Sequence, residues 1–380
     1  MRSMRVLMTA DTVGGVWTYA LELARGLACY GAEVTLATMG APLSPSQRRE
    51  AARLNRLILC ESAYKLEWMD EPWADVDDSC AWLWSLAQAA RPDAVHLNTY
   101  AHGALPWKPP VLMVGHSCVL SWWQAVKGED APAEWGVYRR RVQAGLQGAD
   151  LVVAPSEAML AALRLHYGPL PASTVIYNGS RPDLFRPARK EPFILAIGRL
   201  WDEAKNIALL ERAAPRLPWP VYVAGEQRHP AGGYMQVQHV QPLGRLSHDD
   251  VRAWLARAAI YALPARYEPF GLSALEAALS GCALVLGDIA SLREIWADSA
   301  LYVPPDDAEA LVEVLSDLIR QPRRRARLAA AARARAARYR PESQARAYWN
   351  AYQSLAAGAV AAQRVCRPLP GSLVAHPLGG

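Results

Sequence analysis

Two glutamates flank the start of one short helix, in a pattern suited to a polar ligand. Glu268 lies in a loop that contains Gly271, and seven residues separate it from Glu276. The Ala- and Leu-rich run 272–279 predicts a helix, whose first turn would offer free backbone N–H groups to an anion. Carboxylates beside such a turn can accept hydrogen bonds from hydroxyl groups. An ordinary solvated helix start is the alternative, so the surrounding residues decide the interpretation.

Two cations six residues apart form a second candidate site. Arg199 and Lys205 follow the apolar run 193–197 and precede an expected helix. Arginine offers phosphate a planar fork and lysine a mobile point charge. A charge-assisted hydrogen bond contributes about 1.5–3 kcal/mol, whereas a helix terminus contributes about 0.3–1 kcal/mol. The pair is therefore expected to dominate the binding of a diphosphate, with two solvated surface charges as the alternative.

Short apolar runs alternate with helical patterns along most of the chain. This alternation is typical of parallel α/β sheets, which bind ligands at the carboxyl ends of their strands. The charged, proline-bounded segment 187–192 separates two such series and predicts two domains, residues 1–187 and 188–340. The runs expected to form strands are 5–9, 34–37, 92–98, 111–117, 151–154, 175–177, 193–197, 221–224, 260–263 and 283–286.

The composition supports a two-domain enzyme of ordinary surface charge. The chain has 380 residues, of which 52% are hydrophobic, so two buried cores can form. A net charge of +5 favours anionic ligands and does not call for a nucleic acid partner. The six cysteines contain no C-x-x-C pair, which argues against a zinc site and a disulfide framework and fits the cytoplasm. No apolar run reaches the length of a membrane span.

The pattern Glu268-Pro269-Phe270-Gly271-Leu272, followed by Glu276 and Gly281, resembles the E-x7-E signature of family 4 of the retaining glycosyltransferases. Other features of that family recur in order between about residues 5 and 355. The resemblance implies the GT-B fold: two doubly wound Rossmann-like domains that face each other across a cleft. It also implies that a last helix, here residues 341–358, returns to the N-terminal domain. The remaining tail, 359–380, is expected to be poorly ordered.

The resemblance implies transfer of a sugar from a nucleoside-diphosphate sugar to an acceptor hydroxyl, with retention of anomeric configuration and no cofactor. UDP-glucose is the first expectation for the donor and GDP-mannose the second. Glu276 would bind the ribose hydroxyls and Glu268 the sugar hydroxyls. The donor site would also include Arg199 and Lys205, the base-side loop Gly244-Arg245, and the segment Phe270-Gly271-Leu272.

The N-terminal half supplies candidates for the opposite wall of the cleft. Gly14-Gly15 lies between a strand and a helix, where it would form an acceptor or phosphate loop or a plain tight turn. His116 aligns with the family's strand-end histidine, which faces the donor sugar, and is assigned a catalytic role with Glu268, Arg199 and Lys205. His102 is assigned to the acceptor side. His96, also at a strand end, is interpreted as a satisfied buried side chain.

No metal ion is expected at this site. The triplet Asp75-Val76-Asp77 has the D-x-D form that some glycosyltransferases use to hold a metal. It follows Pro72 and precedes Ser79-Cys80-Ala81-Trp82, a context that is typical of the start of a helix. We interpret the triplet as the acidic first turn of a helix. Asp288 is a single carboxylate near the donor loop, and a hard cation prefers several oxygen ligands.

Three helices are expected near the C-terminus, at residues 307–319, 324–339 and 342–355, and they carry a basic surface. The arginines 323, 324, 325, 327, 333, 335 and 338 form either a solvated helix face or a weak contact with an anionic membrane. We expect the protein in the cytoplasm. The alternative is peripheral attachment to the inner face of the membrane. Two other functions remain open: a nucleotide-sugar epimerase on the same fold, and a non-catalytic sugar-nucleotide-binding protein.

Overall fold

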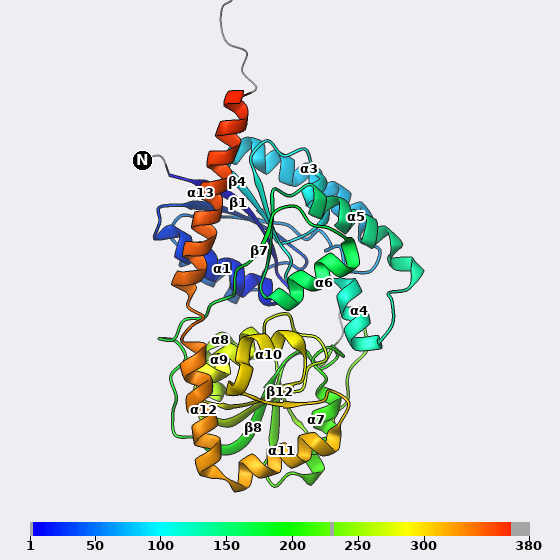
Figure 1. Cartoon of the computed structure of the whole chain (residues 1–380), viewed down its shortest axis with the longest axis vertical. Helices are drawn as coiled ribbons and strands as arrows, with labels where there is room; N and C mark the ends of the chain where they lie inside the picture. Colours follow the sequence, from blue (N-terminus) through cyan, green and yellow to red (C-terminus); the bar gives the residue numbers. More distant parts are fainter. Residues whose placement is uncertain (1–2, 229–231, 366–380) are drawn as a thin grey trace, which may run out of the picture.

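The protein consists of two α/β domains that face each other, as the computed structural model shows (Figure 1). The structure describes residues 3–228 and 232–365. Each domain has one parallel sheet with helices on both faces. The predicted fold class is confirmed.

The N-terminal sheet has seven parallel strands in the order β3-β2-β1-β4-β5-β6-β7. Its strands are β1 Arg5–Asp11, β2 Glu33–Met39, β3 Leu57–Glu61, β4 Ala94–Leu97, β5 Val111–Val114, β6 Leu151–Ala154 and β7 Ser173–Val175. Its helices are α1 Gly15–Ala28, α2 Pro45–Ala52, α3 Trp73–Ala90, α4 Val119–Lys127, α5 Gly136–Gln147 and α6 Glu157–Tyr167, with 3₁₀ turns at Ala101–Ala104 and Ala133–Trp135.

The second sheet has six parallel strands in the order β10-β9-β8-β11-β12-β13. They are β8 Glu191–Ile197, β9 Val221–Ala224, β10 Gln241–Gly244, β11 Ala258–Leu263, β12 Ala283–Gly287 and β13 Leu301–Val303. Its helices are α7 Ile207–Ala213, α8 His248–Arg257, α9 Leu272–Leu279, α10 Ala290–Trp296, α11 Ala308–Arg320 and α12 Pro322–Ala336, with 3₁₀ turns at Ala214–Arg216 and Ala297–Ser299. The strand order reverses at β1/β4 and at β8/β11, where open α/β sheets bind ligands.

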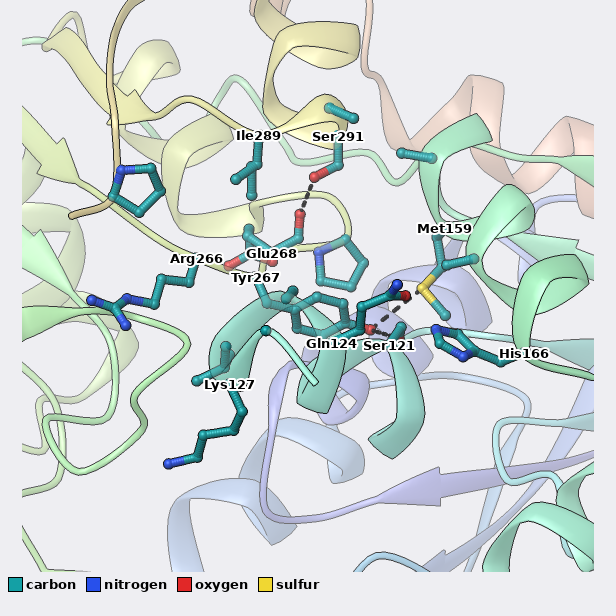
Figure 2. Close-up of a pocket in the computed structure, with 18 of the residues that line it drawn as sticks. Ser121, Gln124, Lys127, Met159, His166, Arg266, Tyr267, Glu268, Ile289 and Ser291 are labelled. Carbon is teal, nitrogen blue, oxygen red and sulfur yellow. Dashed lines mark hydrogen bonds between the residues drawn. The ribbon is translucent and has the colours of Figure 1, made fainter. Parts of the chain in front are cut away.

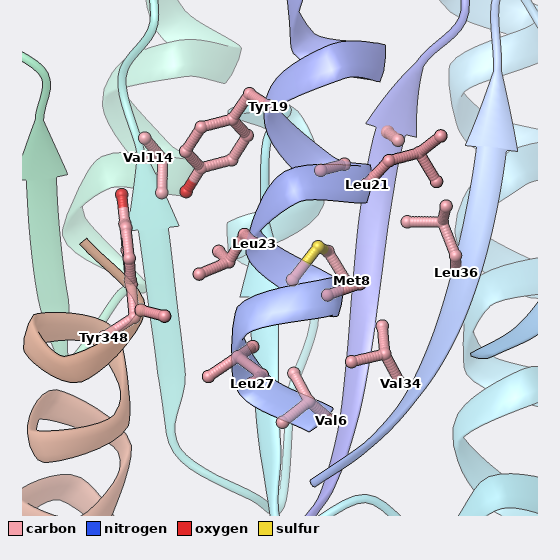
Figure 3. Packing of buried hydrophobic residues seen from close by; sticks show 14 of the residues in the cluster. Val6, Met8, Tyr19, Leu21, Leu23, Leu27, Val34, Leu36, Val114 and Tyr348 are labelled. Atoms are coloured by element: carbon pink, nitrogen blue, oxygen red, sulfur yellow. The ribbon is translucent and has the colours of Figure 1, made fainter. Parts of the chain in front are cut away.

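The N-terminal core lies between the sheet and helix α1. Leu23 and Leu27 stand four residues apart on α1, and both side chains are fully buried against β1 and β2 (Figure 3). Burying one such side chain contributes about 1.5–3 kcal/mol. The packing fixes the direction of α1, so its N-terminus at Gly15 points at the second domain.

Helix α13, Pro341–Val365, returns to the N-terminal domain as predicted. Tyr348 and Tyr352 are fully buried in the N-terminal core. Gly26 makes room for this contact, because a Cβ at that position would lie 2.5 Å from the Cβ of Ala345. The helix extends seven residues beyond the predicted end at residue 358, and the tail from residue 366 lies outside the described residues.

The structure revises several element boundaries. Strand β3 and helix α4 were not predicted, because each is short and lacks a clean alternation or helical period. Phe185 already packs in the core of the second domain, so the chain crosses over before the predicted boundary at residue 187. Helix α3 begins at Trp73, and Asp75 lies in its first turn as interpreted.

Three of the seven arginines predicted to form the basic surface are bonded within the second domain. Arg324 pairs with Asp317, Arg325 donates to the Leu318 carbonyl, and Arg335 donates to the Glu294 carbonyl. Within the described residues, no helix combines the length and apolar character needed to cross a membrane.

Candidate active site at the interdomain cleft

Glu268 is held by three fixed contacts at the N-terminus of α9. Its Oε1 accepts the Gly271 N–H at 3.1 Å, and its Oε2 accepts from Lys205 Nζ at 2.7 Å. Its backbone carbonyl accepts the Ser291 hydroxyl at 2.6 Å. Gly271 adopts φ +89°, a left-handed conformation that favours glycine and turns the chain into the helix. The sequence therefore places this carboxylate at the helix mouth with little freedom.

Arg199 and Lys205 lie in the loop between β8 and α7. Gly198 leaves room for the lysine, because a Cβ there would lie 2.9 Å from Lys205 Cγ. Arg199 donates to Asp202 at 2.7 Å, and its guanidinium lies 4.8 Å from the centre of the Trp201 ring. Burial acts to raise the pKa of Asp202, but the charges of Arg199 and Lys205 outweigh it and lower that pKa. The loop thus carries two oriented cations beside Glu268.

The glycine pair of the N-terminal domain faces the start of helix α9. Gly14 and Gly15 form the start of α1, and no side chain caps this helix end. A Cβ on Gly15 would lie 3.9 Å from Leu272 Cδ1, so the N-termini of α1 and α9 meet across the cleft. Two helix N-termini with free N–H groups at one place form an environment that favours negative charge.

Asp11 belongs to the same cleft and was not predicted. Its Oδ1 accepts the Val13 N–H at 2.6 Å at the end of β1. Burial raises the pKa of Asp11 to about 6, while its hydrogen bond to Val13 and the charge of Arg199 oppose the shift. The signal in the sequence was its position, a carboxylate at the carboxyl end of a strand where the strand order reverses.

His116 lies at the end of β5 and is held by its neighbours. Its Nε2 lies 2.7 Å from Asn98 Oδ1, and Tyr19 packs edge-on against its ring at 4.5 Å. Burial lowers the pKa of His116 to about 3, so the imidazole is neutral at physiological pH. The predicted interpretation of His96 is confirmed, since it is fully buried and bonded to Tyr19 and Tyr352.

Glu276 is a partly exposed carboxylate on α9. Among the described residues, its carboxylate oxygens have no hydrogen-bond partner. Desolvation raises the pKa of Glu276 to about 7, opposed by Arg252 of α8, and Glu22 of α1 raises it further. In the second sheet, Gly244 ends β10 at φ +68°, and its carbonyl accepts the Gly225 N–H at 2.9 Å. Arg245 follows and is exposed.

Two predicted contacts are not supported by the structure. His102 is 3% exposed, and its ring nitrogens lie 2.7 Å from the Ser79 and Thr99 hydroxyls, so it has no free atom for an acceptor. The Phe270 ring is 3% exposed and packs edge-on against Tyr339 at 5.6 Å in the core of the second domain. Only the backbone of Phe270 remains available to a donor.

The acidic residues considered for a metal are engaged elsewhere. Asp75 accepts the Lys65 N–H at 2.8 Å, and Asp77 pairs with Arg141. Asp288 is held by Arg293, including a contact of 2.7 Å, which lowers the pKa of Asp288. In residues 3–228 and 232–365, no group of three His, Cys, Asp or Glu side chains is arranged to hold a metal ion.

Tyr267, next to Glu268, crosses into the N-terminal domain. Its hydroxyl accepts the Cys118 N–H at 3.1 Å and lies 2.8 Å from Ser121 Oγ (Figure 2). Glu294 accepts the N–H groups of Glu157 and Ala158, at the start of α6, at 2.8 and 3.0 Å. Ser121, Ala158 and Tyr267 line a cavity of about 720 Å³ between the domains, which Glu268 and Pro269 also line. The loop that carries Glu268 is therefore anchored to both domains.

Replacing Tyr267 with phenylalanine should loosen this anchor. The Cys118 N–H would lose its partner, and a buried unsatisfied donor costs about 1–3 kcal/mol. We expect amide exchange in residues 118–121 to become about tenfold faster, as measured by hydrogen–deuterium exchange. Tyr302→Phe is the matched control, because the Tyr302 hydroxyl bonds only to Leu292 and Ala297 of its own domain. Equal exchange in residues 118–121 for wild type and Tyr267→Phe would show that the anchor contributes nothing.

Both halves of the chain match glycosyltransferase families. Residues 183–335 match "Glycosyl transferases group 1", and residues 13–184 match "Glycosyltransferase Family 4". A glycogen synthase of Mycobacterium tuberculosis is 29% identical over 278 residues, which cover 66% of this chain and 64% of that protein. A D-inositol 3-phosphate glycosyltransferase of Xylanimonas cellulosilytica is 28% identical over 389 residues, 89% of this chain and 91% of that protein.

Solved structures show the same fold. Sucrose-phosphate synthase from Thermosynechococcus elongatus superposes with a TM-score of 0.77 at 19% identity, over 94% of this chain and all of that one. HepE of Anabaena, in complex with UDP and glucose, superposes with a TM-score of 0.73 at 17% identity, over 92% of this chain and all of that one. The two family matches together span both domains, and the motif around Glu268 and Glu276 lies in the second of them. The chain therefore belongs to glycosyltransferase family 4, whose members have the GT-B fold.

Proposed function

We propose that the protein transfers a sugar from a nucleoside-diphosphate sugar to an acceptor hydroxyl, with retention of anomeric configuration. The observation that carries the proposal is the convergence of Arg199, the Lys205–Glu268 pair and the α9 N-terminus at one point of the cleft. Fixed cations and helix dipoles stabilise a departing diphosphate because they need no reorganisation as charge develops. The bond from C1 to the diphosphate breaks, a bond to the acceptor oxygen forms, and the released diphosphate takes up the acceptor proton.

Each part of the donor has a proposed partner. Arg199 and Lys205 bind the diphosphate, and Glu268 with the N–H groups at Gly271 and Leu272 binds the sugar oxygens. Glu276 accepts from the ribose hydroxyls, since its carboxylate is unpaired and partly exposed. The loop Gly244-Arg245 borders the base. UDP-glucose is the proposed donor, supported by the HepE complex with UDP-glucose, and GDP-mannose is the second candidate, supported by mannosyltransferase relatives.

The acceptor is proposed to approach from the N-terminal domain. Asp11, Gly14 and Gly15 lie there, opposite Leu272 and Arg199. Asp11 can accept a hydrogen bond from the acceptor hydroxyl, because a carboxylate with a pKa near 6 is largely ionised at neutral pH. A weak peripheral contact with an anionic membrane remains a proposal for the exposed arginines of α12, Arg323, Arg327 and Arg333.

Transfer is proposed to need no divalent metal. The support is that two oriented cations and a helix N-terminus already face the diphosphate position, and that Asp288 is neutralised by Arg293. We expect activity to survive in excess EDTA. Loss of activity in EDTA that Mg²⁺ or Mn²⁺ restores would overturn this part of the proposal.

The whole proposal is tested by incubating the protein with UDP-glucose and GDP-mannose in separate reactions. A transferase without its acceptor is expected to release free sugar and nucleoside diphosphate slowly. Epimerisation would instead change the sugar while the donor stays intact. A binding protein would shift the melting temperature and leave both donors unchanged. Each outcome separates one of the three functions that the sequence left open.

Glu276→Ala should weaken the binding of the free nucleoside diphosphate about tenfold or more. Hydrogen bonds to a charged group contribute about 1.5–3 kcal/mol, and each 1.4 kcal/mol is a factor of ten in Kd. The carboxylate accepts best when ionised, and its pKa is about 7, so the affinity of wild type relative to Glu276→Gln should increase from pH 6 to pH 8. Calorimetry measures both effects. Equal affinity of wild type and Glu276→Ala would reject the ribose role.

A further inference from the structure

Asn98 has only one orientation that satisfies its neighbours. Its backbone N–H donates to Thr9 Oγ1 at 2.8 Å, and its side-chain Nδ2 donates to the Thr9 carbonyl at 2.6 Å. A carbonyl oxygen can only accept, so the NH₂ group must face Thr9. The amide oxygen Oδ1 is thereby turned toward the rings of His116 and His96, at 2.7 and 3.3 Å from their Nε2 atoms.

This orientation fixes where His116 carries its proton. The amide oxygen is an acceptor, so His116 Nε2 must donate and therefore bears the hydrogen. A neutral imidazole has one N–H, which leaves Nδ1 with a free lone pair. Among the described residues, Nδ1 has no hydrogen-bond partner. It is also not buried, since it does not belong to the buried polar atoms that lack a partner. It is therefore accessible as an acceptor.

The residues behind Asn98 hold the arrangement in place. His96 Nδ1 lies 2.5 Å from the Tyr352 hydroxyl of α13, and His96 Nε2 lies 3.3 Å from the Tyr19 hydroxyl of α1. Tyr19 also packs against the His116 ring. Helices α1 and α13 thus support the β4 and β5 ends from which Asn98 and His116 extend.

We propose that Asn98 is a positioning residue that locks His116 in the Nε2–H form, so that Nδ1 accepts a hydrogen bond from a hydroxyl of the donor sugar. The inference rests on the proposed function, because it assumes a sugar donor in the cleft. It adds a specificity rule: the sugar group that reaches Nδ1 must donate a hydrogen. Fluorine at that position can accept but not donate, so it is a poor replacement for the hydroxyl.

The protonated nitrogen is measured directly by NMR of ¹⁵N-histidine-labelled protein without any substrate. Protonated and unprotonated ring nitrogens resonate in separate regions, and His116→Ala identifies the His116 signals by their loss. We expect Nε2 to be protonated and Nδ1 unprotonated. Tyr352→Phe is the matched control, since it removes a contact of His96 and leaves the Asn98–His116 bond intact. A proton on Nδ1 in the wild type would overturn the inference whether or not the protein is a transferase.

Asn98→Asp tests the same residue through its pH profile. A carboxylate still accepts from Nε2–H, but its charge favours the imidazolium and raises the pKa of His116. Protonated Nδ1 can no longer accept, so kcat/KM relative to wild type should fall about tenfold or more between pH 8.5 and pH 6. The groups in contact with His116 and His96 do not titrate in this range, because burial lowers the pKa of His96 to about 3 and raises the pKa values of Tyr19, Tyr348 and Tyr352. Asp11, with a pKa of about 6, is present in both proteins, so its titration cancels in the ratio. A ratio that stays constant with pH would contradict the proposal.

Binding of deoxy and deoxyfluoro donors completes the test. At the sugar position that contacts Nδ1, the deoxy and deoxyfluoro analogues should both bind more weakly than the parent donor, by the same factor in Kd, because neither can donate a hydrogen bond. A fluoro analogue that binds as tightly as the parent at every position would show that His116 donates and would overturn the inference. If no parent donor binds, the proposed function fails, while the NMR result still decides the protonation of His116.

Discussion

Replacing Lys205 with alanine should lower kcat/KM for glycosyl transfer by a factor of about 100 or more. The departing diphosphate gains charge in the transition state, and a charge-assisted hydrogen bond there contributes about 1.5–3 kcal/mol. Each 1.36 kcal/mol corresponds to a factor of ten in rate. The lysine is held beside Glu268 at 2.7 Å, with 20% of its side chain exposed, so little water is available to replace its charge.

Lys127→Ala is the matched control for this prediction. Lys127 forms an ion pair of similar length, 2.8 Å, with Glu203 in the same loop, but 33% and 57% of the two side chains are exposed. Surface pairs of this kind contribute about 0–1 kcal/mol, so kcat/KM should change by less than about fivefold. Steady-state kinetics with a folded Lys205→Ala protein provide the measurement. Full activity of that variant would reject the assignment of Lys205 to the diphosphate.

Most strands were predictable because their signals are local, whereas the doubly wound arrangement of the sheets was implied only by the family resemblance. Buried parallel strands appear as short apolar runs, and β1, β8, β11 and β12 lie where such runs occur. Strand β3 was missed because it lies at the edge of the sheet, where only one side is paired and Ile58 is 60% exposed. The C-terminal helix was placed only through the family resemblance. Its contact with α1 joins residues more than 300 positions apart, which no local pattern reveals.

The residues proposed for the donor side form local patterns in the sequence, whereas those proposed for the opposite wall do not. Arg199 and Lys205 share one loop, and Glu268 precedes the helix that carries Glu276, so both spacings are visible in the sequence. The role of Asp11 depends on Arg199 of the other domain, and the state of His116 depends on Asn98 and Thr9 of two other strands. His102 was predicted to contact the acceptor, because sequence does not show that Ser79 and Thr99 enclose its ring. For each of these residues, contacts between segments that are distant in the sequence set the environment of the side chain.

Glu268→Gln should slow transfer about 100-fold and leave the affinity for the free nucleoside diphosphate nearly unchanged. The amide keeps the shape of the side chain and one acceptor oxygen, but it loses the charge that orients Lys205 and accepts from the sugar hydroxyls. The ribose is assigned to Glu276, eight positions away on α9, and Lys205 keeps its charge for the diphosphate, so the affinity should change far less than the rate. Single-turnover kinetics and calorimetry separate the two quantities.

A double-mutant cycle distinguishes this catalytic role from a purely structural ion pair. Lys205 and Glu268 are in contact, and each single variant leaves the partner's charge unpaired, so the effects on kcat/KM should combine less than additively. If the pair only stabilised the fold, the single variants would lower the melting temperature, and Lys205→Ala combined with Glu268→Gln would restore both stability and activity. We expect stability to be restored and activity to remain at least 100-fold below wild type, because neither the diphosphate cation nor the sugar-binding carboxylate is then present. Recovery of activity in the double variant would contradict the proposed roles of both residues.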